Sequence, residues 1–135
     1  MRVLDYEIPD RLYYSKEHEW VLLEGNEATV GITDYAQKQL HEIVYAEIQK
    51  ESTEVKQFQQ MGVVESIKSV SDIFSPVTGK ITKVNVELGN SPEILNQDPY
   101  GKGWLAKIIL MNSKKDISNL LSAKQYAEYI KSLEE

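Results

Sequence analysis

Hydrophobic positions along the chain fall into short runs that are separated by turn-forming residues. The runs are rich in β-branched, aromatic and aliphatic side chains, as is typical of strands. They predict strands at 20–23, 28–32, 43–48, 61–67, 70–74, 81–86 and 104–110, with a weaker strand near 55–58. Many short strands with turn signals between them predict a mostly-β barrel or sandwich.

Two connections between these runs are short enough to be hairpin turns. Gly25 and Asn26 lie between the first two predicted strands, and this pair suits a tight turn. Only Lys68 and Ser69 separate two later strands. The pattern therefore predicts a second hairpin with a lysine at its tip.

Two segments show helical rather than strand-like spacing. Thr33 stands where a helix N-cap belongs and Asp34 adds negative charge to the first turn, so we expect a helix of about two turns there. Near the C-terminus, Ser122 and Gln125 form a capping box ahead of a final apolar stripe. One helix, or two short ones, should therefore pack on the sheet.

The composition fits one domain over residues 1–135 and limits its chemistry. The chain is 41% hydrophobic and 27% charged and has no cysteine, which excludes disulfides, thiol nucleophiles and thiolate metal ligands. The net charge is −6, and residues 1–60 hold 12 acidic and 6 basic side chains. This balance disfavours nucleic acids and anionic membranes as partners. The acidic N-terminus is unlike a signal peptide and no run could span a membrane, so we expect a cytoplasmic protein, and we also expect a monomer.

Residues suited to catalysis or metal binding form no convincing group. Each histidine, His18 and His41, is followed by a glutamate, but neither pair has the i, i+4 spacing that places two ligands on one helix face. Glu17 and Glu19 would alternate on one strand face, as surface acids often do. The nucleophile elbow of serine hydrolases and the glycine-rich loops that bind nucleotides do not occur. We therefore expect neither catalytic residues nor a metal site.

Lys68 stands among small serines, with no cation next to it in the sequence. A catalytic lysine must be neutral near pH 7, which needs burial or a nearby cation, and an exposed tip offers neither. Covalent attachment has the opposite requirement, because another enzyme's active site must close around the amine. From the pattern alone, a solvated turn lysine is the simpler interpretation and an attachment site is the alternative.

Six motifs occur in a specific order along nearly the whole chain. They are YSKEHEW at 14–20, VGITDYAQ at 30–37, VESIKS at 64–69, SPVTG at 75–79, SPEILN at 91–96 and PYGKGW at 99–104. With these motifs the chain resembles the H proteins of the glycine cleavage system, a family of lipoyl carriers. The resemblance implies a flattened hybrid of barrel and sandwich, with a short internal helix and a C-terminal helix.

The resemblance also implies a cofactor and four site residues. Lys68 takes the position that carries lipoic acid in amide linkage, and Glu65 the position that offers a carboxylate to the lipoylating enzyme. Glu19 and Asp72 fall where family members line the groove that receives the loaded arm, although ordinary surface acids are an equal alternative for both.

Three partner enzymes follow from the same resemblance, besides the lipoylating enzyme. A pyridoxal-phosphate-dependent glycine decarboxylase loads an aminomethyl group onto the arm, and a tetrahydrofolate-dependent aminomethyltransferase takes its methylene. A flavin-dependent dihydrolipoyl dehydrogenase reoxidises the dithiol. The carrier itself catalyses nothing.

Some positions depart from the family's pattern. The family usually has Gly at His41, Pro and Gly within 49–53, Ala or Thr where Ser69 and Val70 stand, and Glu at Lys80. These changes affect the surface that partners would meet. Two alternatives therefore stay open: a paralogous carrier that serves lipoate relay or sulfur oxidation, and an unmodified interaction module.

Overall fold

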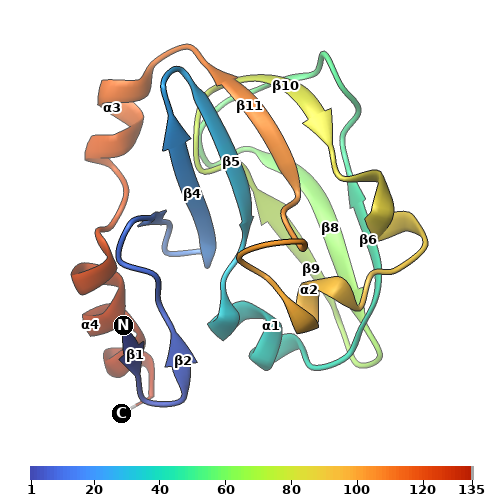
Figure 1. Cartoon of the computed structure of the whole chain (residues 1–135), viewed down its shortest axis with the longest axis vertical. Coiled ribbons are helices and arrows are strands. Elements are labelled where there is room, and N and C mark those ends of the chain that lie inside the picture. The colour runs from blue at the N-terminus through green and yellow to red at the C-terminus, as the bar shows by residue number, and fades with distance from the viewer. Residues whose placement is uncertain (135) are drawn as a thin grey trace.

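The computed structural model describes residues 1–134, which form three antiparallel sheets (Figure 1). The largest sheet has the strand order β3 (Tyr13–Tyr14), β4 (Glu19–Glu24), β5 (Glu27–Ile32), β11 (Ala106–Leu110), β10 (Gly79–Val84) and β7 (Glu54–Val55). The second sheet has the order β6 (Ile43–Ile48), β8 (Gln60–Ser66) and β9 (Val70–Phe74). The third pairs β1 (Arg2–Val3) with β2 (Tyr6–Glu7).

Short helices connect and cover these sheets. They are α1 (Asp34–Leu40), the 3-10 helix η1 (Val86–Gly89), α2 (Ile94–Gln97), α3 (Ser113–Ser118) and α4 (Ala123–Leu133). The Thr33 side chain accepts the Ala36 N–H and caps α1, and the capping box of Ser122 and Gln125 is formed at α4. Both predicted helix starts are thus confirmed. No helix within residues 1–134 is long and apolar enough to cross a membrane.

The main core lies between the six-stranded and three-stranded sheets. Each sheet turns aliphatic side chains toward the other, and these pack into one buried cluster that includes Val21, Val30, Ile108, Val64 and Ile73. Packing of two sheets face to face is the sandwich arrangement. The predicted mostly-β class, with a short internal helix and a C-terminal helix, is confirmed.

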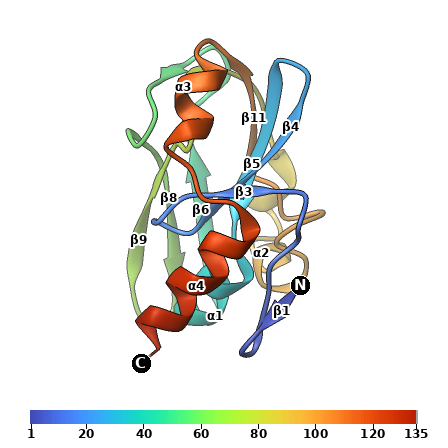
Figure 2. The ribbon, with the colours of Figure 1, turned by 90° about the vertical axis from the view of Figure 1, so that its left-hand side faces the viewer.

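A second buried cluster packs α4 against the outside of the large sheet and the N-terminal segment. Figure 2 shows α4 lying beside β3 and the N-terminal strands. Trp20, Tyr14 and Tyr126 are its largest fully buried members. Gly31 allows this packing, because a Cβ there would lie 2.5 Å from the Trp20 ring.

The structure differs from the pattern mainly where elements are very short. The predicted strand near 55–58 is reduced to Glu54–Val55, and the breaker-rich stretch 87–103 holds α2 and most of η1. Strands β1 to β3 have two residues each. Elements of this length show no periodicity in the sequence, because periodicity needs several residues on each face.

Candidate functional site

Lys68 lies at the tip of the hairpin formed by β8 and β9, in a turn that Ser66 closes. The Ser66 N–H donates to the Ser69 carbonyl at 2.8 Å, and the Ser66 hydroxyl accepts the Ser69 N–H at 3.1 Å and the Lys68 N–H at 3.3 Å. The turn residues are therefore Ile67 and Lys68, one position earlier than the predicted Lys68 and Ser69. The shift arises because a serine side chain can replace a backbone acceptor and end the strand.

The Lys68 side chain is exposed, as the hairpin pattern predicts. Its neighbours Ile67 and Val70 are 67% and 65% exposed, so little of the chain covers the tip. No carboxylate of residues 1–134 lies within ion-pair distance of the Lys68 amine. The amine is thus open to the active site of another enzyme.

Glu65 and Asp72 belong to the same hairpin as Lys68. Glu65 is half-buried on β8, between Tyr45 of β6 and Val70 of β9. Asp72 is exposed on β9, opposite Val63, and its Oδ1 accepts the Gln60 amide at 3.0 Å. Glu65 and Asp72 therefore face solvent from one small sheet.

Glu19 reaches this sheet from β4 as a buried acid, only 2% exposed. Its Oε1 accepts the Ser15 hydroxyl at 2.5 Å and its Oε2 accepts the Phe74 N–H at 3.2 Å. Burial raises the pKa of Glu19 to about 8, against the opposing effect of these hydrogen bonds. Glu19 is therefore mostly protonated at neutral pH and ties β4 to the end of β9.

The expected surface pair of Glu17 and Glu19 is not formed. Glu17 lies exposed in the turn before β4, where His18 adopts φ 72 and Ser15 bonds back to Glu19. This turn sends the two glutamates to different environments. Sequence alternation fails here because β4 begins only at Glu19.

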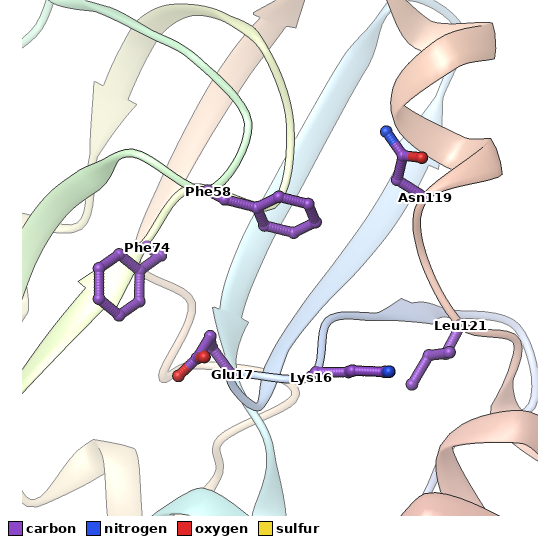
Figure 3. A pocket seen from close by; sticks show the side chains of 6 residues that line it. All are labelled: Lys16, Glu17, Phe58, Phe74, Asn119 and Leu121. Atoms are coloured by element: carbon purple, nitrogen blue, oxygen red, sulfur yellow. The ribbon is translucent and has the colours of Figure 1, made fainter.

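A groove of about 460 Å³ opens beside Glu17 and Phe74 (Figure 3). Phe58 and Phe74 form its apolar side, while Lys16 and Glu17 point in opposite directions along its floor. The remaining lining residues are Asn119 and Leu121. Neither Glu19 nor Asp72 is among the lining residues, although the Glu19 side chain accepts the N–H of Phe74, which is one of them. The sequence analysis did not include Phe58 among the candidate site residues. The signal for it was an aromatic side chain within the otherwise polar stretch 49–60.

The family model for the glycine cleavage H-protein matches residues 12–133. The chain belongs to this family. Its members are lipoyl carriers without catalytic activity, so the expectation of a non-enzyme is confirmed.

Individual relatives agree with this assignment over nearly the full chain. The glycine cleavage system H protein of Symbiobacterium thermophilum is 49% identical over 124 residues, which cover 92% of this chain and 96% of that one. The probable glycine cleavage system H protein of Pyrococcus abyssi is 46% identical over 134 residues, covering 98% and 99%. The crystal structure of a glycine cleavage system H protein from Mycobacterium marinum matches with a TM-score of 0.83 and 32% identity, covering 90% and 98%.

Two residues in the segments that depart from the family's pattern have the positive φ that glycine favours. His41 follows α1 with φ 66 and ψ −145, and Ser52 adopts φ 75. Such conformations are strained for residues with a Cβ. The fold of the H-protein family is thus retained here at a local cost in stability.

The two histidines, His18 and His41, lie in different environments. His18 lies against Tyr35, and its Nδ1 is 2.9 Å from the Tyr126 hydroxyl. Burial lowers the pKa of His18 to about 4. His41 is exposed at the end of α1. Within residues 1–134, no three His, Cys, Asp or Glu side chains come close enough together to hold a metal ion.

Proposed function

We propose that this protein carries lipoic acid in amide linkage on Lys68 and shuttles the aminomethyl group of glycine. It accepts this group at a pyridoxal-phosphate-dependent glycine decarboxylase and delivers it to a tetrahydrofolate-dependent aminomethyltransferase, and a dihydrolipoyl dehydrogenase completes the cycle. Bound lipoate supplies the dithiol that a chain without cysteine lacks. The cytoplasmic location, the monomeric state and the single domain expected from the sequence stay predictions.

The observation that carries this proposal is the exposed amine of Lys68 in a member of a lipoyl-carrying family. An acyl group on this amine would meet no covering segment, since both turn neighbours are exposed. The Ser66 hydroxyl holds the turn independently of the lysine side chain. The tip therefore fits a covalently attached arm without rearrangement of the sheet.

Three acidic residues support the handling of the arm in this proposal. Asp72 is four residues from Lys68, at most about 13 Å along the strand, and is the exposed anion on β9 for a cationic amine. Glu65 offers its carboxylate to the lipoylating enzyme beside the tip. Glu19 is buried and contacts the backbone of β9, so its proposed part is to fix the strand end and to provide a second acid near the groove.

Mass spectrometry of the protein from its native cell tests the attachment. We expect a lipoyl increment on the peptide that contains Lys68. In Lys68→Ala the increment should be lost while the thermal midpoint stays within about 1 °C of wild type, because an exposed side chain contributes little to stability. A lysine that is always unmodified would refute the carrier role, and a large loss of stability would contradict the exposed tip.

Glycine dependence separates the proposed pathway from a paralogous one. The lipoylated protein should be reduced by the host's glycine decarboxylase only when glycine is present. Lipoylation without any glycine-dependent reduction would favour a carrier for lipoate relay or sulfur oxidation. Lys68→Ala serves as the control, because it should show no reduction under either condition.

A further inference from the structure

Lysine side chains gather on the outer face of the large sheet. Ile81 and its pairing partner Ile108 are fully buried in the core between the two larger sheets. Side chains alternate between the two faces of a strand, so the residues next to this pair point away from the core. Lys83 of β10 pairs with Lys107 of β11 on that outer face. Two cations therefore stand directly opposite each other.

An irregularity in β10 adds Lys80 to the same face. Residues three positions apart in a regular strand point to opposite faces. The register of the β10–β11 pair shifts between Ile81 and Lys83, which leaves Thr82 without a partner on β11. This extra residue turns Lys83 back to the face of Lys80, as bulges commonly re-aim side chains. Lys80 is also one of the positions that depart from the family's pattern.

The cations at one end of this row lack counter-charges. Like charges directly opposite each other destabilise an antiparallel pair. The ion pairs found within residues 1–134 include neither Lys83 nor Lys107. Two acids on the neighbouring strands, Glu27 and Glu54, lie at the Lys80 end of the row. The uncompensated positive charge is therefore concentrated at Lys83 and Lys107.

The Trp104 ring lies against these two lysines. The Lys83 and Lys107 amines are 6.0 and 5.8 Å from the centroid of the ring, within the range of cation–π interactions. Within residues 1–134 the Trp104 indole N–H has no hydrogen-bond partner, whereas that of Trp20 donates to the Pro99 carbonyl. No buried side-chain donor in that range lacks a partner, so the Trp104 N–H is open to solvent. It can therefore donate to an acceptor from another molecule.

A hollow of about 440 Å³ opens beside Trp104. Its lining is cationic at Lys83 and Lys102 and apolar at Val86, which is 79% exposed; the other lining residues are Val84, Asn85 and Glu87. The buried Asn85 amide donates to the carbonyls of Lys102 and Trp104 at 2.9 and 2.8 Å. These bonds hold the segment before β11 against the end of β10, so the hollow has fixed walls.

We propose that this surface binds an acidic segment of a partner protein that also carries an aromatic or apolar side chain. We call it the indole–lysine surface; it consists of Lys83, Lys102, Trp104, Lys107 and the hollow beside them. Carboxylates of the segment pair with the lysines and accept the indole N–H, and the apolar side chain enters the hollow beside Val86. The surface lies on the face of the large sheet that is turned away from the three-stranded sheet. It is thus separate from the surroundings of Lys68 and goes beyond the proposed function.

Charge makes a short acidic protein segment the occupant. An exposed lysine pairs only weakly with one anion, so useful affinity requires several carboxylates on one ligand. The whole chain has a net charge of −6, which opposes an extended polyanion such as a nucleic acid or an anionic membrane. A short segment avoids this repulsion, because it meets only the local cations.

An NMR titration of the isotope-labelled full chain tests this proposal. The probe is the peptide EEFEE, blocked at both ends, in about 20 mM sodium chloride, where charges are little screened. We expect it to shift the amide signals of residues 83–87 and 102–107 and the indole signal of Trp104. The indole signal of Trp20 should not move, because that ring is buried. The affinity should fall about tenfold when sodium chloride is raised to about 200 mM.

A charge variant and a matched control locate the binding. Lys83→Gln with Lys107→Gln removes both cations beside the ring and should weaken binding about tenfold. Lys114→Gln with Lys115→Gln changes the net charge equally on exposed lysines of α3, which follows the other end of β11 (Figure 1). This control should bind the peptide as wild type does. The thermal midpoint should stay within about 2 °C of wild type in both variants, because the substituted side chains lie on the surface.

Three results would overturn the proposal. They are the absence of binding to wild type, equal affinity of wild type and the Lys83/Lys107 variant, and shifts that lie outside the indole–lysine surface. Tighter binding of tripolyphosphate than of the peptide would also overturn it, because the surface would then be a site for small anions. The titration needs no lipoyl group, so each of these results leaves the proposed function of Lys68 untouched.

Discussion

Replacing His41 with glycine should stabilise the protein by about 1 kcal/mol. His41 has φ 66 and ψ −145, a conformation that costs roughly 1 to 3 kcal/mol for a residue with a Cβ. Glycine would relieve this strain, but its greater conformational freedom in the unfolded chain reduces the gain in stability by about 0.5 to 1 kcal/mol. The side chain is exposed, and its imidazole makes no hydrogen bond with residues 1–134, so little else is lost.

The backbone contacts of His41 should persist in the variant. Its N–H donates to the Gln37 carbonyl at 3.0 Å, and its carbonyl accepts the Asn96 amide at 2.7 Å. Urea unfolding should therefore show a higher midpoint with an unchanged m-value, and the thermal midpoint should rise by about 3 °C.

His41→Ala is the matched control, because it removes the ring and keeps the Cβ. This variant should have the stability of wild type to within about 0.5 kcal/mol. If His41→Ala gains as much as His41→Gly, the ring and not the backbone is responsible. A loss of stability in His41→Gly would refute the strain argument outright.

Two further predictions concern buried polar groups. Burial raises the pKa of Glu19 from its usual 4.5 to about 8, which favours the protonated folded state, so the free energy of unfolding should fall as pH rises from about 4.5 to 8. The pKa of His18 is lowered from 6.5 to about 4, so His18 changes the free energy of unfolding in the opposite direction only below pH 6.5. Urea unfolding between pH 6.5 and 8 should therefore show the loss of stability in wild type and not in Glu19→Gln. Equal dependence of the free energy of unfolding on pH in the two proteins would contradict the raised pKa of Glu19. In Tyr126→Phe the loss of the hydroxyl that contacts His18 Nδ1 and Thr33 Oγ1, at 2.9 and 2.8 Å, should reduce the free energy of unfolding by about 1 to 3 kcal/mol, and an unchanged urea midpoint would be evidence against this network.

Local signals in the sequence were sufficient for most of the regular elements. Gly25 and Asn26 form the turn of the β4–β5 hairpin, with Gly25 at φ 65. Thr33 and Ser122 cap the helices that they were predicted to start. These features depend on a few consecutive residues, so the chain encodes them directly. Strand β7 pairs with the distant β10, and β1 to β3 have only two residues each. Elements this short show no periodicity, so the sequence pattern could not predict them.

Some features of the candidate site could be predicted from the sequence, and others depend on the tertiary structure. The exposed position of Lys68 follows from a hairpin pattern, and its proposed role follows from motifs in a fixed order. The surroundings of Glu19 could not be predicted, because its partners Ser15 and Phe74 meet it only when the turn before β4 folds back and β9 reaches the large sheet. The groove at Phe58 and Phe74 likewise joins segments far apart in the sequence.

The sequence by itself therefore determined a mostly-β chain with a lysine at a hairpin tip and no thiol of its own, since alternation, turn residues and composition are local properties. The tertiary structure alone decided which acids are buried and which are exposed. Glu19 and Asp72 are both acidic residues near β9, yet Glu19 is enclosed between two sheets and Asp72 faces water. Desolvation depends on the packing of distant segments, and no local pattern records that packing.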